Sequence, residues 1–238
     1  DEWSKYDYRV EITDFDFLFA EPDAPVEQRI DLPEGFVSLA SRTPPAGSWP
    51  ALRYLTERGV TKDDILKWKI GFCKDGEYAG RVVIPSFNEN GYANYYVARS
   101  YGFEWPKYKN PPASRDIIFN ELYVNWNEDL VIVEGVFDAI KAGNGIPLLG
   151  STLREGSALF QAIVKNGNRV YLALDEDASK KTRSIIRLLQ RYGVEVYEVD
   201  TSGVEDVGDM SKEDFQSRKD NAAIVEKDNY LLQRLFAI

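Results

Sequence analysis

Carboxylates follow three apolar runs in the second half of the sequence. They are Glu134 and Asp138 after residues 130–133, Asp175 and Asp177 after residues 169–174, and Asp206 and Asp209 after residues 194–199. A single carboxylate at such a place is often a helix cap or a solvated loop residue. Several that converge raise one another's pKa unless a cation neutralises them. Their joint placement therefore favours a site for a divalent cation.

The residue types that are missing narrow the chemistry further. The chain has no histidine and a single cysteine, Cys73, for which we expect a core position. Histidine general bases, Ser-His-Asp triads and zinc held by histidine or by several thiolates are thereby excluded. Because oxygen ligands suit hard cations, we expect Mg2+ or Mn2+ as the cofactor and no zinc in this chain.

Alternating strands and helices are expected to position these carboxylates. The strands are predicted at Leu130–Val133, Ile146–Leu149, Arg169–Leu174 and Val194–Val199, with helices at Val136–Ala142, Glu155–Val164 and Ala178–Tyr192. Strand–helix alternation with short links is typical of a parallel sheet covered by helices. The active crevice of such a sheet lies outside the carboxyl ends of its strands. The sequence thus predicts an α/β unit of about four parallel strands with acidic side chains along one edge.

A smaller mixed α+β unit is predicted before the parallel sheet. Its expected elements are a helix over 50–58 capped by Ser48 and ended by Gly59, a second helix begun by a capping box at Thr61–Asp64, and the strands Arg81–Phe87 and Tyr92–Ser100 around the turn Asn88–Gly91. We divide the chain into a partly irregular, proline-punctuated extension at 1–48, the mixed unit at 49–128, the α/β unit at 129–210 and a helical segment at 211–238.

Basic and aromatic residues are interleaved within residues 80–115. Arg81, Arg99, Lys107, Lys109 and Arg115 outnumber Glu89 and Glu104, in a chain whose net charge is −10. Eight aromatic residues lie in the same stretch. A single nucleic-acid strand needs cations for its backbone and can stack its bases on aromatic rings. A sheet whose aromatic residues are only core and whose charges are only solvated is the alternative.

Several short segments resemble the catalytic core of DnaG-type DNA primases. Val131–Ala139, with Glu134-Gly135 and then Asp138, is similar to the family's Toprim motif, and Leu148–Thr152, Leu172–Ala178 and Glu205–Met210 resemble its later elements. Upstream, Gly80–Pro85, Val97–Arg99 and Pro106–Asn110 are similar to the basic strands and the Pro-Lys-Tyr-x-Asn segment of these primases. The resemblance spans about residues 50–210, and the short chain resembles phage-type primases.

The resemblance implies a function and a set of site residues. It implies a Toprim α/β domain behind a basic mixed α+β unit, and metal-dependent synthesis of RNA primers during DNA replication. Glu134 would be the catalytic residue, and the metal ligands would be Glu134, Asp175, Asp177, Asp206 and Asp209. Nucleotide or template would contact Arg81, Arg99, Lys107, Lys109, Asn110 and Asp138. The implied partners are a single-stranded DNA template, ribonucleoside triphosphates and a replicative helicase.

The sequence departs from the family pattern at three points. It lacks the cysteines and histidines of the family's zinc-binding domain, Asn120 stands where a basic residue is common, and no helicase-binding C-terminal domain is evident. A Toprim nuclease and a non-catalytic module that binds single-stranded DNA therefore remain alternatives. No apolar run approaches the roughly 20 residues that cross a bilayer, so we expect a cytoplasmic protein that does not bind membranes.

Overall fold

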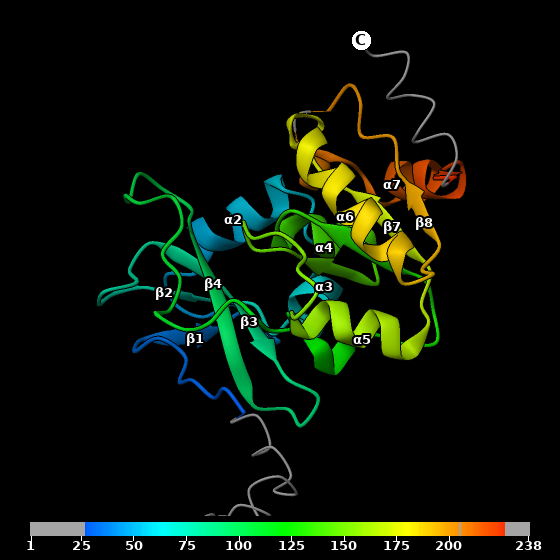
Figure 1. Ribbon diagram of the computed structural model, residues 1–238. Coiled ribbons are helices and arrows are strands. Elements are labelled where there is room, and N and C mark those ends of the chain that lie inside the picture. Colours follow the sequence, from blue (N-terminus) through cyan, green and yellow to red (C-terminus); the bar gives the residue numbers. More distant parts are fainter. Residues whose placement is uncertain (1–26, 205, 227–238) are drawn as a thin grey trace, which may run out of the picture.

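The first unit of the molecule is an antiparallel sheet. The computed structural model describes residues 27–204 and 206–226 (Figure 1). The sheet contains β1 (Phe36–Ser38), β2 (Gly71–Cys73), β3 (Arg81–Phe87) and β4 (Ala93–Ser100), in that spatial order. Both predicted strands are confirmed, and Asn88 closes the turn between them because its side-chain Oδ1 accepts from the backbone N–H groups of Asn90 and Tyr92. Cys73 is buried, as expected.

The second unit is built on a mostly parallel sheet. Its strands are β5 (Leu130–Val133), β6 (Gly145–Pro147), β7 (Val170–Ala173), β8 (Val196–Glu198) and β9 (Ala223–Ile224). Their spatial order is β6-β5-β7-β8-β9, and only β9 runs antiparallel to its neighbour. The predicted four-stranded parallel sheet is therefore confirmed, and β9 extends it by an edge strand.

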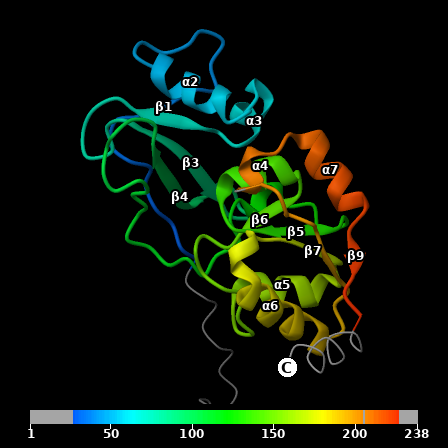
Figure 2. The ribbon, with the colours of Figure 1, turned by 90° about the horizontal axis from the view of Figure 1, so that it is seen from above.

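Helices cover both faces of the parallel sheet (Figure 2). One face carries α4 (Val136–Ala142) and α7 (Lys212–Asp220), and the other carries α5 (Ala158–Asn166) and α6 (Ser179–Arg191). The fully buried strand β5 divides its side chains between these layers, because successive residues of a strand point to opposite faces. Val131 and Val133 pack with α4, whereas Leu130 and Ile132 pack with α5 and α6.

Two helices connect the units. Side chains of α2 (Trp49–Glu57) and α3 (Lys62–Lys67) share one hydrophobic cluster with α4 and α7. The predicted capping box of α3 is confirmed, since Asp64 Oδ2 accepts from Thr61 N at 2.9 Å and Thr61 Oγ1 accepts from Asp64 N at 3.2 Å. The other carboxylate oxygen of Asp64 forms an ion pair with Lys212 Nζ of α7 at 2.5 Å. Ser48 occupies the N-cap position of α2, as predicted, but its side chain makes no capping hydrogen bond.

The unit boundaries differ from those predicted at 48 and 210. Phe36–Ser38 pairs with β2, so the sheet of the first unit begins inside the expected linker. The second unit continues through α7 to β9, which pairs with β8. The described residues also form three short 3-10 helices: η2 (Glu121–Tyr123), η3 (Glu176–Ala178) and η4 (Val207–Asp209). The remainder of the expected extension (1–26) and of the C-terminal segment (227–238) lies outside the described residues. Among the described residues, none of the helices has the length and apolar character needed to cross a membrane.

Candidate active site

A cavity of about 360 Å³ lies at the carboxyl ends of the parallel strands, where the two units meet. Four carboxylates line it: Glu134 directly after β5, Asp138 on α4, Asp175 directly after β7, and Asp206 before η4. The first unit contributes Val97, Tyr108, Asn110 and Arg115. The predicted convergence of acidic residues from three strands is thus present, and it faces side chains from the basic segment.

Asp138 and Asp206 form a hydrogen-bonded pair of carboxyl groups. Asp138 is only 4% exposed, and its Oδ2 accepts from the backbone N–H of Gly135 at 2.7 Å. Burial and the neighbouring Asp206 raise the pKa of Asp138 to about 8. Burial also opposes ionisation of Asp206, but the hydrogen bonds from Asp138 and from the Gly208 amide outweigh it and lower the pKa of Asp206. At neutral pH the pair therefore holds one proton, on Asp138.

Asp175 and Glu134 are the other two carboxylates that line the cavity. Burial, followed by repulsion from Asp206, Glu134 and Asp177, raises the pKa of Asp175 to about 6. Glu134 forms an ion pair with Lys181 of α6, with Nζ and Oε2 2.6 Å apart and both side chains about one-fifth exposed. Lys181 was not predicted, because 47 residues separate it from Glu134 and only the packing of α6 brings them together.

The cavity offers oxygen donors of the kind that Mg2+ and Mn2+ prefer. As arranged, however, no three acidic side chains among the described residues form a ready metal cluster. Lys181 balances Glu134, and the shared proton balances Asp138 and Asp206. The donor chemistry fits a hard cation, and Asp175, whose pKa is raised first by burial and then by its acidic neighbours, lies where such a cation would bind.

Two further predicted ligands lie outside the cavity lining. Asp177 is exposed on η3, where its charge acts on Asp175. Asp209 is exposed on η4, and its charge acts on the buried Lys141. Their roles as ligands stay predictions.

The predicted basic residues lie in different environments. Arg99 stacks over Tyr108, with 4.8 Å from its Cζ to the ring centroid, and Lys107 is exposed and close enough to lower the pKa of Asp206. Arg81 is 2% exposed, and its Nη1 donates to the carbonyl of Lys107 at 3.4 Å. Lys109 pairs with Glu77 at 3.0 Å. Arg81 and Lys109 thus support the segment that carries Lys107, and Asn110 lines the cavity itself.

One arginine near the carboxylates was not among the predicted residues. Arg58, at the end of α2, lies over the Phe137 ring with 4.9 Å from its Cζ to the centroid, and its charge lowers the pKa of Asp206. No pattern in the sequence marks it, since the packing of α2 against α4 places it there.

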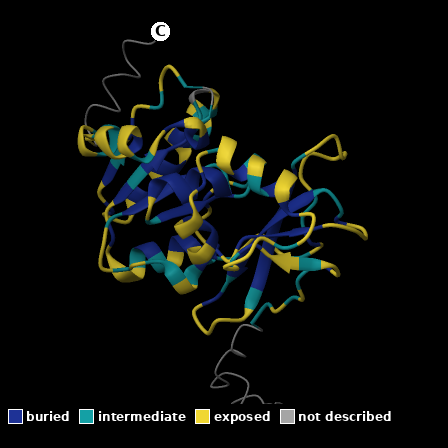
Figure 3. Cartoon of the chain, turned by 180° about the vertical axis from the view of Figure 1, so that it is seen from behind, coloured by how far each residue is buried: buried dark blue, intermediate teal, exposed yellow. Residues whose placement is uncertain are grey.

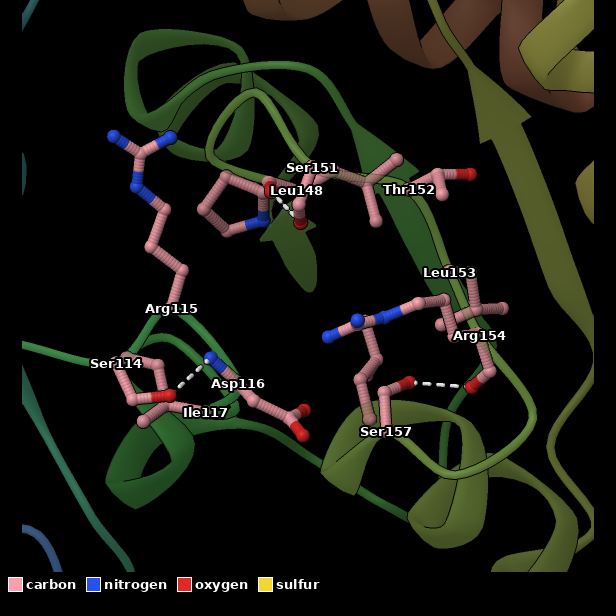
Figure 4. Close-up of a pocket in the computed structure, with 12 residues that line it drawn as sticks. Ser114, Arg115, Asp116, Ile117, Leu148, Ser151, Thr152, Leu153, Arg154 and Ser157 are labelled. Carbon is pink, nitrogen blue, oxygen red and sulfur yellow. Dashed lines mark hydrogen bonds between the residues drawn. The ribbon is translucent and has the colours of Figure 1, made fainter.

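Arg115 lies between the acidic cavity and a second, smaller cavity. The second cavity has a volume of about 140 Å³, and Arg115 lines both. Figure 4 shows its side chain extending away from Asp116 and toward the turn that follows Leu148. There its Nη1 donates to the carbonyl of Leu149 at 3.2 Å.

Asn120, which stands where the family commonly has a basic residue, is buried and does not line the acidic cavity.

Comparison with known proteins defines the class of the fold. A DNA primase domain from Pseudomonas aeruginosa matches 84% of this chain with a TM-score of 0.65 and 19% identity, over 79% of its own length. A DnaG primase catalytic domain bound to ssDNA matches 79% with a TM-score of 0.64 and 20% identity, over 74% of its length. The fold is that of a primase catalytic domain.

The sequence comparison points to the same group. The DNA primase of Thermotoga maritima is 30% identical over 137 residues, which are 50% of this chain and 24% of that protein. No family model matches the chain. The chain therefore has the fold of a DnaG-type primase catalytic core, and it spans about a quarter of the length of the curated relative that it matches.

Proposed function

We propose that this chain is the RNA polymerase core of a DNA primase, which joins ribonucleotides into short primers on single-stranded DNA. The observation that carries the proposal is the cavity that four carboxylates of the second unit line together with Tyr108, Asn110 and Arg115 of the first unit. Nucleotidyl transfer needs both kinds of surface, one for cations and one for phosphates. The similarity to primases in sequence and fold supports this proposal.

The acidic edge would hold Mg2+ or Mn2+ through Glu134, Asp175 and Asp206, and Asp177 and Asp209 would contribute from outside the cavity lining. When bound, such cations neutralise charge that develops on the transferring phosphoryl group. Asp138, as a neutral donor to Asp206, would keep that carboxylate ionised and oriented. Glu134 would lie nearest the attacking 3′-hydroxyl, with Lys181 holding its carboxylate in place until a cation binds.

The basic rim would hold the triphosphate and the template. Arg58 and Lys107 are close enough to Asp206 to lower its pKa, so both would be available to phosphates of the triphosphate or of the template at this edge of the cavity. Arg99 is oriented by its stacking on Tyr108, and Arg115 by its bond to Leu149. A related catalytic domain has been captured with ssDNA, which supports the same kind of template here. A replicative helicase is the partner that such a core would serve.

A gel assay tests the proposal. The protein is incubated with single-stranded DNA, labelled ribonucleoside triphosphates and Mg2+ or Mn2+, and the products are resolved under denaturing conditions. We expect short template-dependent RNA that disappears in Asp175→Ala and Asp177→Ala. Asp63→Asn, an exposed position on α3, is the matched control and should be as active as the wild type. Metal-dependent shortening of a labelled DNA strand without RNA synthesis would instead identify a nuclease.

A further inference from the structure

Two aromatic side chains project into solvent from the loop that follows β4. The loop, residues 101–107, extends from the body at the upper left of Figure 1, and Figure 3 shows the same region as largely exposed. Phe103 is fully exposed and Trp105 is 88% exposed. Single exposed apolar residues are common, but two large rings within three residues mark a surface for an interaction.

The base of this loop is firmly held. Ser100 N donates to the carbonyl of Lys107 at 3.0 Å, and Tyr101 N donates to the carbonyl of Gly80 at 3.1 Å. The buried Arg81 adds a hydrogen bond to the same Lys107 carbonyl. Both ends of the loop are thus fixed to β3 and β4, so its tip is presented by a rigid support.

Glu104 explains why the two rings face outward. Its carboxylate turns in toward the strands, where Oε2 accepts from Ser100 Oγ at 2.8 Å. It also lies against the Cα of Gly80, at a place that a Cβ would occupy. With the polar residue between them anchored to the body, Phe103 and Trp105 are left in solvent, which is the reverse of the usual hydrophobic arrangement.

The loop rises from the rim of the acidic cavity. Tyr108, which follows it directly, lines that cavity, and Arg99 stacks on the Tyr108 ring. Lys107, at the end of the loop, is exposed and acts electrostatically on Asp206. The rings of Phe103 and Trp105 thus lie on the same loop as the positively charged Lys107, next to the proposed nucleotide site. This combination suits a ligand that has both flat apolar faces and negative charge. A single nucleic-acid strand has both, whereas a duplex hides the faces of its bases.

We propose that Phe103 and Trp105 form a stacking platform for bases of the single-stranded template beside the acidic cavity, with Lys107 contacting the backbone. This inference deepens the proposed function and rests on it. Stacking tolerates any base, so the platform would hold a template without reading its sequence. It would favour single strands over duplexes of the same length.

Binding to labelled oligonucleotides tests the platform separately from synthesis. The titrations use oligothymidylate and an abasic strand of equal length, with Phe103→Ala, Trp105→Ala and the control Trp49→Ala, whose side chain is 74% exposed on α2. Each loop variant should bind oligothymidylate about tenfold more weakly, the order expected for one lost stacking contact. Binding of the abasic strand should not change. The dependence of affinity on salt should keep its slope in the loop variants, because no phosphate contact is lost, whereas Lys107→Ala should lower it by about 0.7.

Several results would overturn the platform. They are wild-type affinity in both loop variants, an equal loss on the abasic strand, and a wild type that does not distinguish the two strands. A change in oligomeric state with unchanged DNA affinity would assign the rings to contact between copies of this chain. The gel assay on the same variants keeps the two proposals apart, since primer synthesis with unaltered DNA binding in Phe103→Ala would refute the platform alone.

Discussion

The proton shared by Asp138 and Asp206 predicts how stability depends on pH. In the folded chain burial and Asp206 raise the pKa of Asp138 to about 8, whereas an aspartate in an unfolded chain has a pKa of about 3.9. Between these two pH values the folded state binds one proton more than the unfolded state. The stabilisation that this proton contributes is therefore complete below about pH 3.9 and is lost as pH rises toward 8. One proton changes the free energy of unfolding by about 1.4 kcal/mol per pH unit. From pH 6 to pH 8 the loss amounts to about 2 kcal/mol, because the proton is half released at pH 8.

Asp138→Asn should remove this dependence, because an asparagine keeps the acceptor for Gly135 N and a donor toward Asp206 without titrating. The assay is urea unfolding at pH 6, 7 and 8 with EDTA present, so that no divalent cation binds the carboxylates. Asp175, whose pKa of about 6 contributes mainly below this range, acts alike in both proteins. We expect the wild type to lose about 2 kcal/mol more than the variant over this interval. Parallel profiles for the two proteins would refute the shared proton.

Three further predictions concern single side chains. Lys181→Met should bind Mn2+ several-fold more tightly by calorimetry, because it removes a cation that competes for Glu134; unchanged or weaker binding would contradict that role. Asp64→Ala should lower the free energy of unfolding by about 2 kcal/mol in urea, since it removes the carboxylate that accepts from Thr61 N in the capping box of α3 and leaves Lys212 without its partner; a loss below about 0.5 kcal/mol would show that the link between the units carries little stability. Glu134→Gln should abolish primer synthesis with an unchanged circular dichroism spectrum, and full activity would remove Glu134 from the mechanism.

Much of the second unit could be predicted because local patterns decide it. The apolar run Leu130–Val133 and the helix Val136–Ala142 have the predicted bounds, and the rule that crevices form at strand ends placed Glu134 and Asp175 in one cavity. Strands of two or three residues such as β1 and β9 were missed, because so few residues show no periodicity and tertiary pairing alone creates them.

The parts of the site that were not predicted depend on distant contacts. The Glu134–Lys181 pair and the approach of Arg58 to Asp206 arise from helix packing, which spacing along the chain does not encode. The basic segment was predicted as a whole, but not the burial of Arg81 beneath the Lys107 carbonyl. Residue type indicated the chemistry of this segment, whereas the fold decided which side chains support it and which face the cavity.

The most direct test of the account is extension of an RNA primer already annealed to a DNA template, since this reaction requires nucleotidyl transfer alone and no initiation. Wild-type protein, a labelled ribonucleoside triphosphate and Mg2+ or Mn2+ should add nucleotides complementary to the template. Glu134→Gln should bind the same primed template equally well and add none. A wild type that binds the primed template without extending it, or a Glu134→Gln variant that extends it normally, would contradict the account.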